Sequence, residues 1–273
     1  MDRSRIPPID DHGRRVPLHG PEAFAGMHKA GALAAEVLDM ITEHVEIGVT
    51  TASLDDLMHE YILAKGATPA PLNYRGFPKS TCISLNHVVC HGIPTPKRKL
   101  QSGDIRNIDV TVILDGWYGD TSRMYAVGKT SKLAQRLMDV TYDCLMRGID
   151  VVRPGATIGD IGHAIQSYAE GQRFSVVEDF CGHGLGRQFH EPPNVPHYGH
   201  SGTGMVLQEG MIFTIEPMIN AGKAACHILS DGWTAVTDDK KLSAQYEHSI
   251  GVTSNGAEIF THSPKGYTKF PYG

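Results

Sequence analysis

Two aspartates in a predicted β-hairpin are the first residues of this sequence whose types and spacing could do chemistry. Residues 107–123 read NIDVTVILDGWYGDTSR, and the Asp-Gly pair at 115–116 is a strong signal for a two-residue turn. Such a turn pairs Asp109 with Ser122 and places Asp120 on the face of Asp109, diagonal to it. Diagonal neighbours lie ~7–8 Å apart, within joint reach of one ion. An inward Asp109 between apolar residues would be costly without a cation. The alternative is one aspartate beside a turn and another exposed on a strand.

A second cluster, FCGHGLGRQFHEPP at 180–193, brings two histidines together with several glycines. His183 stands between two glycines, which allow tight backbone turns and leave its ring accessible, and His190 follows seven residues later. A dinucleotide-binding loop would require Gly-x-Gly-x-x-Gly, but Arg187 occupies the place of the third glycine. The segment therefore favours metal or acid–base chemistry, with a pair of surface-loop histidines as the alternative.

Two glutamates in strand-like apolar surroundings complete the set. Glu216 lies in MIFTIEPMI and Glu247 in SAQYEHSIGV, and either one alone could be a structural residue in an ion pair. Together with the two aspartates they would repel one another strongly in one cavity. Two divalent cations would offset that charge, so four carboxylates and one histidine suit a two-metal hydrolytic site. The absence of cysteine from the set argues against a structural zinc site.

Apolar spacing and turn residues predict the elements that must position these side chains. In chain order we expect helices at 21–48, 53–65, 131–148 and 158–170, and strands at 80–92, 105–127 and through much of 174–260. Ser53 and Asp56 stand in cap positions of the second helix. Residues 1–20 have no periodicity and are expected to be a flexible extension, and residues 266–273 a C-terminal tail.

The two halves of the chain repeat. LQSGDIRNID at 100–109 and LQEGMIFTIE at 207–216 match at an offset of 107 residues, and both end in a carboxylate. The same offset places Thr50 on Thr157 and Tyr61 on Tyr168. We therefore predict a duplicated helix–helix–sheet unit, with halves at about 21–130 and 131–265, joined in one α+β domain with a pseudo-two-fold axis.

The composition is that of a globular protein with a sizeable core. Of 273 residues, 41% are hydrophobic and 20% are charged, and the net charge of −5 argues against a protein that coats nucleic acid. The sequence has neither the ~18-residue apolar run of a membrane span nor the apolar core of a signal peptide at its N-terminus. The five cysteines form no CxxC pair and are expected to be reduced thiols in a cytoplasmic protein.

Taken together, these motifs carry a family resemblance. From Pro21 to about Phe260 the chain resembles type I methionine aminopeptidases of the short bacterial kind. The most specific stretch is Phe-x-Gly-His-Gly-Leu-Gly-x-x-x-His at 180–190, supported by CISLNHVVCHGIP at 82–94 and by TIEPM and SAQYEHS. The resemblance implies five ligands of a dimetal centre and two substrate-side histidines, which are Asp109, Asp120, His183, Glu216 and Glu247, and His91 and His190.

The resemblance also implies a fold and an activity. The fold is the pita-bread α+β architecture, a curved antiparallel sheet backed by two helix pairs, in a single catalytic domain over 21–265. The activity is removal of the initiator methionine from nascent proteins when the second residue is small. Water activated by two divalent ions (Mn, Fe, Co or Zn) attacks the scissile carbonyl, with Glu216 as the base. His190 would donate to the developing oxyanion, and His91 would bind the scissile amide nitrogen.

Further residues are assigned by the same resemblance. The walls of the methionine pocket are Tyr74, Phe77, Cys82, His91, Phe189 and Trp233, and an aromatic and thiol lining suits a thioether. His190 is counted with these among the substrate-binding residues. From the residues alone, Tyr74 and Phe77 would be placed in the core or a loop. A monovalent-cation site is implied at Asn86, Val88 and Ser243.

The expected partners are N-termini of nascent polypeptides beginning with Met, close to the ribosome. We expect a monomer with no membrane partner and no nucleic-acid specificity. The basic segment 96–99 (PKRK) could contact ribosomal RNA or form a solvated turn.

Two rival functions remain. A proline-specific peptidase on the same fold, such as prolidase, usually carries a large extra N-terminal domain, for which 20 residues before the first helix leave no room. A pita-bread binding protein without catalysis would have lost metal ligands, whereas all five are present here.

Overall fold

The computed structural model describes residues 6–272. In chain order, a pair of helices is followed by a group of strands, and this order then repeats. The helices are α1 (Pro21–Ile41), α2 (Thr51–Ala64), α3 (Lys132–Asp150) and α4 (Ile158–Gly171), with 3₁₀ turns η2 (Thr42–His44) and η3 (Tyr74–Gly76). The strands of the first half are β1 (Thr68–Pro69), β2 (Cys82–Leu85), β3 (Val88–Cys90), β4 (Ile105–Leu114) and β5 (Trp117–Ala126). Those of the second half are β6 (Ser175–Val176), β7 (Gly182–Gly184), β8 (Glu191–Val195), β9 (Ile212–Ile215), β10 (Met218–Asn220), β11 (Cys226–Ile228), β12 (Ala235–Thr237), β13 (Ser243–Gln245), β14 (His248–Thr253) and β15 (Gly256–Ile259). Within residues 6–272, none of the helices has the length and apolar character needed to cross a membrane.

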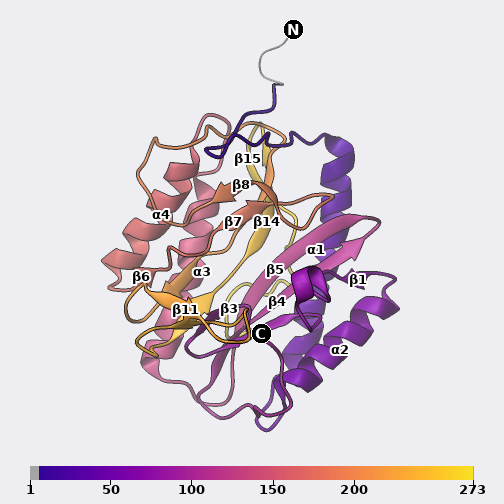
Figure 1. Cartoon of the computed structure of the whole chain (residues 1–273), viewed down its shortest axis with the longest axis vertical. Coiled ribbons are helices and arrows are strands. Elements are labelled where there is room, and N and C mark those ends of the chain that lie inside the picture. The colour runs from indigo at the N-terminus through magenta and orange to yellow at the C-terminus, as the bar shows by residue number, and fades with distance from the viewer. Residues whose placement is uncertain (1–5, 273) are drawn as a thin grey trace.

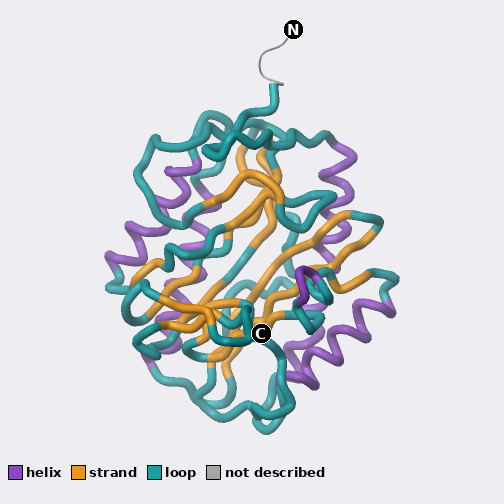
Figure 2. The backbone as a smooth tube through the Cα atoms, in the orientation of Figure 1, coloured by secondary structure: helices purple, strands orange, loops and turns teal. Residues whose placement is uncertain are grey.

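Two helix pairs flank the strands, α1 and α2 on one side and α3 and α4 on the other (Figures 1 and 2). The strand pairings are antiparallel, and the longest ladder joins β4 to β5 over ten residue pairs. One apolar cluster lies between the first helix pair and β4–β5, and a larger one lies between α3, α4 and the strands of the second half. The predicted α+β class with antiparallel sheet and paired helices is confirmed.

The predicted internal repeat is visible in contacts that recur at the same offset. Thr50 and Thr157 cap α2 and α4 in the same way, each accepting a hydrogen bond at its hydroxyl from the backbone three residues on. The matched contacts are the bridges Thr50–Lys99 and Thr157–Val206, the backbone bonds Gly48–Leu100 and Gly155–Leu207, and the side-chain bonds Tyr61–Glu36 and Tyr168–Asp143. Contacts of the same type at equivalent positions indicate two copies of one unit.

Two helix boundaries differ from the prediction. Thr50, not Ser53, caps α2, because the Thr50 hydroxyl accepts from the Ser53 backbone N–H at 3.1 Å, which places Ser53 inside the helix. The first helix ends at Ile41 instead of near Gly48. There the Thr42 hydroxyl donates to the Leu38 carbonyl, and the chain tightens into a 3₁₀ turn.

The β4–β5 hairpin has the predicted register. Asp109 is opposite Ser122, and Thr111 is opposite Asp120, so the two aspartates share one face of the sheet. Asp115 and Gly116 form the turn with φ of 52° and 76°, the positive values that a two-residue turn of this kind requires.

Residues 6–20 differ from the expected flexible extension, and residues 1–5 of that prediction lie outside the described residues. Ile9 bridges Arg15 across a tight turn, and Val16 is only 1% exposed within the larger apolar cluster. The His19 backbone N–H donates to the Gly210 carbonyl at 2.7 Å. A few anchoring side chains hold this segment to the second half, and such contacts leave no periodic signal in the sequence.

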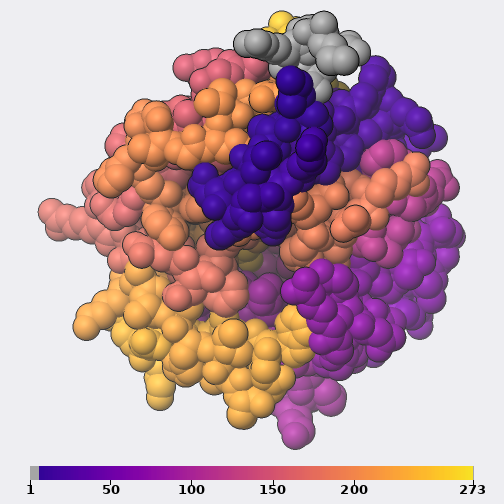
Figure 3. Space-filling view, turned by 45° about the horizontal axis from the view of Figure 1, so that its top comes forward, coloured from indigo at the N-terminus to yellow at the C-terminus, as the bar shows by residue number. Residues whose placement is uncertain are grey.

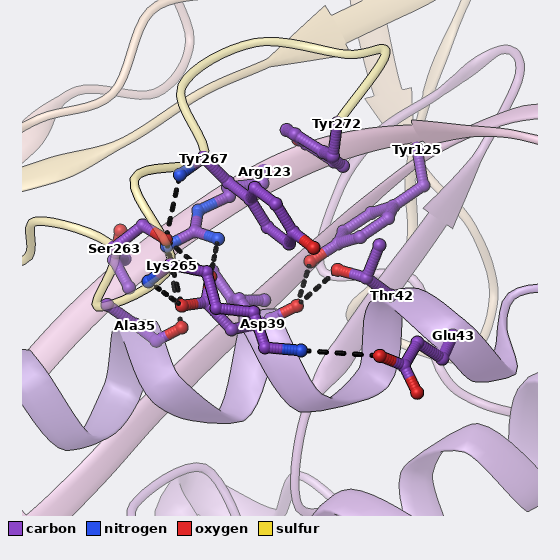
Figure 4. A network of polar contacts seen from close by, with 12 residues as sticks. Ala35, Asp39, Thr42, Glu43, Arg123, Tyr125, Ser263, Lys265, Tyr267 and Tyr272 are labelled. Atoms are coloured by element: carbon purple, nitrogen blue, oxygen red, sulfur yellow. Dashed lines mark hydrogen bonds and ion pairs between the residues drawn. The ribbon is translucent and has the colours of Figure 1, made fainter.

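The C-terminal residues fold back on α1 and β5 of the first half (Figure 4). Asp39 of α1, 1% exposed, pairs with the buried guanidinium of Arg123 of β5. The same carboxylate accepts from the Ser263 hydroxyl at 2.7 Å and from the Lys265 backbone N–H at 3.0 Å. The Tyr272 hydroxyl donates to the Met124 carbonyl at 2.7 Å. The described part of the expected tail is thus bound to the fold, and Gly273 lies outside the described residues.

The basic segment 96–99 lies on the surface. Arg98 forms a bidentate pair with Asp104, with both oxygens 2.8 Å from Nη2, which ties part of this segment to the chain's own carboxylate.

Candidate metal centre and active-site cavity

The five predicted metal ligands come from both halves and line one cavity of about 430 Å³. They are Asp109 of β4, Asp120 of β5, His183 of β7, Glu216 directly after β9 and Glu247 between β13 and β14. The halves are tied together beside the site, because the Glu247 backbone N–H donates to the Ser122 carbonyl at 3.1 Å and the Thr121 hydroxyl donates to the Glu247 carbonyl at 2.7 Å. The centre therefore lies where the two repeats meet.

Ligand atoms of Asp120, His183 and Glu247 all lie within 4.8 Å of one another, close enough to hold one ion. The His183 Nε2 is 3.5 Å from Asp120 Oδ2 and 3.7 Å from Glu216 Oε1. His183 Nδ1 lies 3.0 Å from the Gly184 carbonyl, to which its N–H donates. That bond leaves Nε2 as the nitrogen that faces the carboxylates, and its lone pair can ligate a metal when the ring is neutral.

Neighbouring side chains orient the carboxylates. The Thr111 hydroxyl donates to Asp120 Oδ1 at 2.6 Å, and the Thr214 hydroxyl donates to Glu216 Oε1 at 2.7 Å. The Gln245 amide donates to Glu216 Oε2 at 3.2 Å. These hydrogen bonds fix which lone pairs point into the cavity.

Asp109 provides the test of whether a cation fits. Its Oδ1 is buried and has no hydrogen-bond partner among the described residues. A buried acceptor without a partner costs about 1–3 kcal/mol, more when it is charged, so native structures usually satisfy it. A cation between Asp109 and the other carboxylates would satisfy this oxygen, and the donor set therefore fits a metal.

Without a cation, the pKa values of the buried carboxyl groups are raised, so their protonated forms are favoured. Burial, with the charges of Asp120 and Glu216, raises the pKa of Asp109 well above its ordinary value, and burial likewise raises that of Glu247. Burial raises the pKa of Glu216 to about 7. Burial alone would lower the pKa of His183, but its hydrogen bond to Asp120 and the charge of Glu216 outweigh that effect and raise it. This much buried negative charge requires compensation.

Two further histidines reach the same cavity, as predicted. His91 follows β3 with φ of 55°, an uncommon conformation for a residue other than glycine. Burial and the nearby His183 lower the pKa of His91 to about 4 and that of His190 to about 3. The Tyr74 hydroxyl lies 3.0 Å from His190 Nδ1. Both rings are therefore neutral near pH 7, and each has one N–H to donate.

The predicted pocket residues also line this cavity. Phe77 and Trp233 pack edge to face with centroids 5.2 Å apart, and Tyr74 packs against Phe189 at 4.8 Å. Cys82 is buried opposite Asp109, and burial together with the Asp109 charge raises the pKa of its thiol. Tyr74 and Phe77 thus face the cavity rather than serving only as loop or core residues.

Sequence reasoning missed several residues of the cavity. Phe180, Met218 and Gln245 line it, and each had a usable signal. Phe180 opens the histidine motif, while Met218 and Gln245 lie two residues from Glu216 and Glu247. His197 was also missed as a positioning residue, although it is fully buried and its Nε2 accepts from the Glu216 backbone N–H at 3.1 Å.

The three residues of the predicted monovalent-cation site lie near one another. The Ser243 backbone N–H donates to the Asn86 carbonyl at 2.8 Å, and Val88 begins β3, two residues further on. The Ser243 hydroxyl is buried without a hydrogen-bond partner among the described residues.

Comparison with known proteins agrees with this geometry. Residues 25–254 match the model of metallopeptidase family M24. A methionine aminopeptidase of Rickettsia prowazekii is 61% identical over 259 residues, which cover 94% of this chain and 99% of that protein. The methionine aminopeptidase of Escherichia coli K12 is 51% identical, over 90% of this chain and 94% of that protein.

Solved structures have the same fold. A crystal structure of the Rickettsia prowazekii methionine aminopeptidase superimposes with a TM-score of 0.89, at 61% identity, and covers 90% of this chain and 99% of that one. Prolidase from Pyrococcus furiosus, at 20% identity and a TM-score of 0.72 over 89% of this chain and 65% of that one, shares the fold alone. By the family match and by these full-length similarities, the chain belongs to metallopeptidase family M24.

Proposed function

We propose that this protein is an aminopeptidase that removes the N-terminal methionine from polypeptides whose second residue is small. The observation that carries the proposal is the combination of groups in one cavity. Five ligand-type side chains, two neutral histidines and an aromatic pocket all line it. The names of relatives at 51–61% identity support the same activity.

Two divalent cations are proposed to be held by Asp109, Asp120, His183, Glu216 and Glu247, with Mn, Fe, Co and Zn all compatible with these donors. When bound, they would lower the pKa of water and polarise the scissile carbonyl. The four carboxylates would balance their charge, and the Gly184 carbonyl keeps His183 in the tautomer that can ligate.

The protein groups would then perform the proton transfers. Glu216 is the proposed general base, since its carboxylate lines the cavity beside the other proposed ligands. Thr214 and Gln245 hold its carboxylate in place. His190, whose Nδ1 is bonded to Tyr74, would donate from Nε2 to the developing oxyanion, while His91 would bind the scissile amide nitrogen.

The apolar part of the cavity would select methionine. Phe77 and Trp233 present ring edges, and Cys82 adds a soft thiol. A thioether gains about 0.3–1.5 kcal/mol from such ring-edge contacts, which a branched side chain would not reproduce.

The cellular setting follows from the substrate. New polypeptides begin with methionine as they leave the ribosome, so we propose action near the ribosome, in the cytoplasm and as a monomer. A monovalent cation at Asn86, Val88 and Ser243 would be structural, since these residues lie outside the cavity lining.

Specificity for the second residue provides the test. His91 and His190 must both reach the scissile bond, which leaves little room beside it. We expect Met-Ala-Ser to be cleaved with kcat/KM about 10²-fold above Met-Leu-Ser or Met-Arg-Ser, because a large side chain would displace a donor by about 1 Å. The measurement is kcat/KM with Mn²⁺ or Co²⁺.

Two control peptides separate the rivals. Cleavage of Ala-Pro without cleavage of Met-Ala-Ser would indicate a proline-specific peptidase instead. Pro-Ala-Ser tests whether the first pocket requires methionine. If no peptide is cleaved by the metal-loaded protein, the proposal of an active enzyme is refuted. Equal kcat/KM values for Met-Ala-Ser and Met-Leu-Ser would refute the inference that the site leaves little room for the side chain of the second residue.

A further inference from the structure

Arg14 brings the N-terminal segment, residues 6–20, into the active-site cavity. It lines that cavity together with Asn194, although it lies 95 positions before Asp109 in the sequence. Its side chain is also 44% exposed. A residue that both lines a cavity and is exposed to solvent lies at the mouth. Figure 3 shows the indigo N-terminal segment lying beside the hollow in this face of the molecule.

The guanidinium of Arg14 is held in place by its own turn. Asp10 accepts from Arg14 Nε at 2.7 Å, from the Arg14 backbone N–H at 2.8 Å and from the His12 backbone N–H at 3.0 Å. On the other side, Arg14 Nη2 donates to Asn194 Oδ1 at 3.1 Å. Among the described residues, none accepts a hydrogen bond from Arg14 Nη1, so its two hydrogens are available to a ligand.

The position of Arg14 fits the path of a bound peptide. If the N-terminal methionine occupies the aromatic pocket, the rest of the chain must leave through the mouth. A second cavity of about 390 Å³ adjoins the first. It is lined by residues 10–12 and shares residues 179–181 and Asn194 with the first cavity. The turn that carries Arg14 thus stands where the two cavities adjoin.

The surrounding charges decide which peptide group Arg14 would bind. Asp10 already balances its positive charge, and the cavity lining adds one further cation, Arg75, but two carboxylates, Asp179 and Glu191. An acidic side chain of the substrate would therefore meet more negative than positive charge. A backbone carbonyl is neutral, accepts from a guanidinium and occurs in every peptide. Such a contact would add affinity without selecting a sequence.

We propose that Arg14 binds a backbone carbonyl of the substrate downstream of the scissile bond, through Nη1. This proposal rests on the proposed aminopeptidase function. It makes the N-terminal segment part of the substrate-binding groove. It predicts that affinity rises at the peptide length that first includes the carbonyl contacted by Arg14, and that further residues add little.

The experiment is a length series of C-terminal amides, from Met-Ala to Met-Ala-Ser-Ala-Gly, with the metal-loaded full chain. In the wild type, kcat/KM should rise about 3- to 10-fold at one step of the series, the usual net contribution of a hydrogen bond at a solvent-exposed site. Arg14→Ala should lose that step through KM, with kcat unchanged, because the contact is made equally in the ground and transition states. Arg15→Ala is the matched control, since Arg15 is exposed in the same segment and lines neither cavity.

Further variants keep the result interpretable. Asp10→Asn retains the Arg14 guanidinium but weakens the hydrogen bonds that hold it in place. This variant should lose part of the rise in kcat/KM with peptide length. Circular dichroism shows whether Arg14→Ala folds. If it does not, Arg14→Lys provides the comparison, because lysine keeps the positive charge and lacks the planar guanidinium with its paired N–H donors. An unchanged length gain in the Arg14 variant, or an equal loss in Arg15→Ala, overturns the proposal. Wild-type failure on every peptide overturns the proposed function itself, and this proposal with it.

Discussion

Glu216→Gln should make the metal-free protein more stable at pH 8, although it removes a proposed ligand. In the folded chain, burial raises the pKa of Glu216 from an ordinary 4.5 to about 7. Between these values the unfolded chain releases the proton first, so stability from this group is full below pH 4.5 and falls as the pH rises to 7. The loss corresponds to about 3 kcal/mol above pH 7, and the neutral glutamine avoids it.

Structural details reduce the expected gain slightly. The Glu216 carboxylate accepts from Thr214 at one oxygen and from Gln245 at the other. A glutamine can keep only one of these bonds as an acceptor, and the lost bond costs about 1 kcal/mol. We therefore expect a gain of about 2 kcal/mol at pH 8 and none at pH 5, where most of the charge penalty is still absent.

Urea unfolding of EDTA-treated protein at the two pH values measures the effect. Glu209→Gln is the control, because Glu209 is exposed and outside the cavity. With Mn²⁺ added at a hundredfold excess over Kd, the wild type should gain about 2.7 kcal/mol, and the order should reverse because the variant, which lacks one charged ligand, should gain less than about 0.7 kcal/mol. A Glu216→Gln protein less stable than the wild type at pH 8 without metal would refute the view that burial penalises the charged form of Glu216.

Three other outcomes are expected. Chelation should abolish cleavage of Met-Ala-Ser, and Mn²⁺, Co²⁺ or Fe²⁺ should restore it in a rate assay but Ca²⁺ should not, because Ca²⁺ prefers more oxygen ligands at longer distances. Asp109→Ala and Glu247→Ala should lower the metal content of the protein, measured by elemental analysis. His91→Ala should retain its metal but lose about 10²–10⁴-fold in kcat. If the His91→Ala protein contains no metal, His91 is a ligand. Asp39→Ala should lower the unfolding free energy in urea by about 3–5 kcal/mol, because it leaves the buried Arg123 charge without its carboxylate. Unchanged stability would show that this ion pair is not needed.

Local sequence signals were sufficient for much of the site. The Asp-Gly turn determined the register of β4 and β5, and with it the shared face of Asp109 and Asp120. Period-two alternation then placed two carboxylates on one side without any knowledge of the rest of the fold. The repeat brought Glu216 to the position equivalent to Asp109. Short-range geometry and internal symmetry can both be predicted from the spacing of residues in the sequence.

Features that depend on distant contacts could not be read in this way. Arg14 reaches the cavity only because Val16 and His19 attach its segment to the second half. The Thr50 cap was missed because Ser53, an equally good capping residue, lies three positions further on. Neither outcome is determined by composition or periodicity, because in each case tertiary packing decides between similar local choices.

The segments at the two ends of the described chain each contact the half that lies farther from them in the sequence, and this has a consequence for synthesis. Residues 6–20 precede the first half and reach the second through Val16 and His19, while residues 261–272 follow the second half and contact both halves, including Asp39 and Met124 of the first. In a chain made from its N-terminus, Asp39 can pair with Arg123 well before Ser263 and Lys265, which complete the hydrogen bonds of this carboxylate, have been synthesised. The packing of the first half is therefore completed only after these later residues have been made.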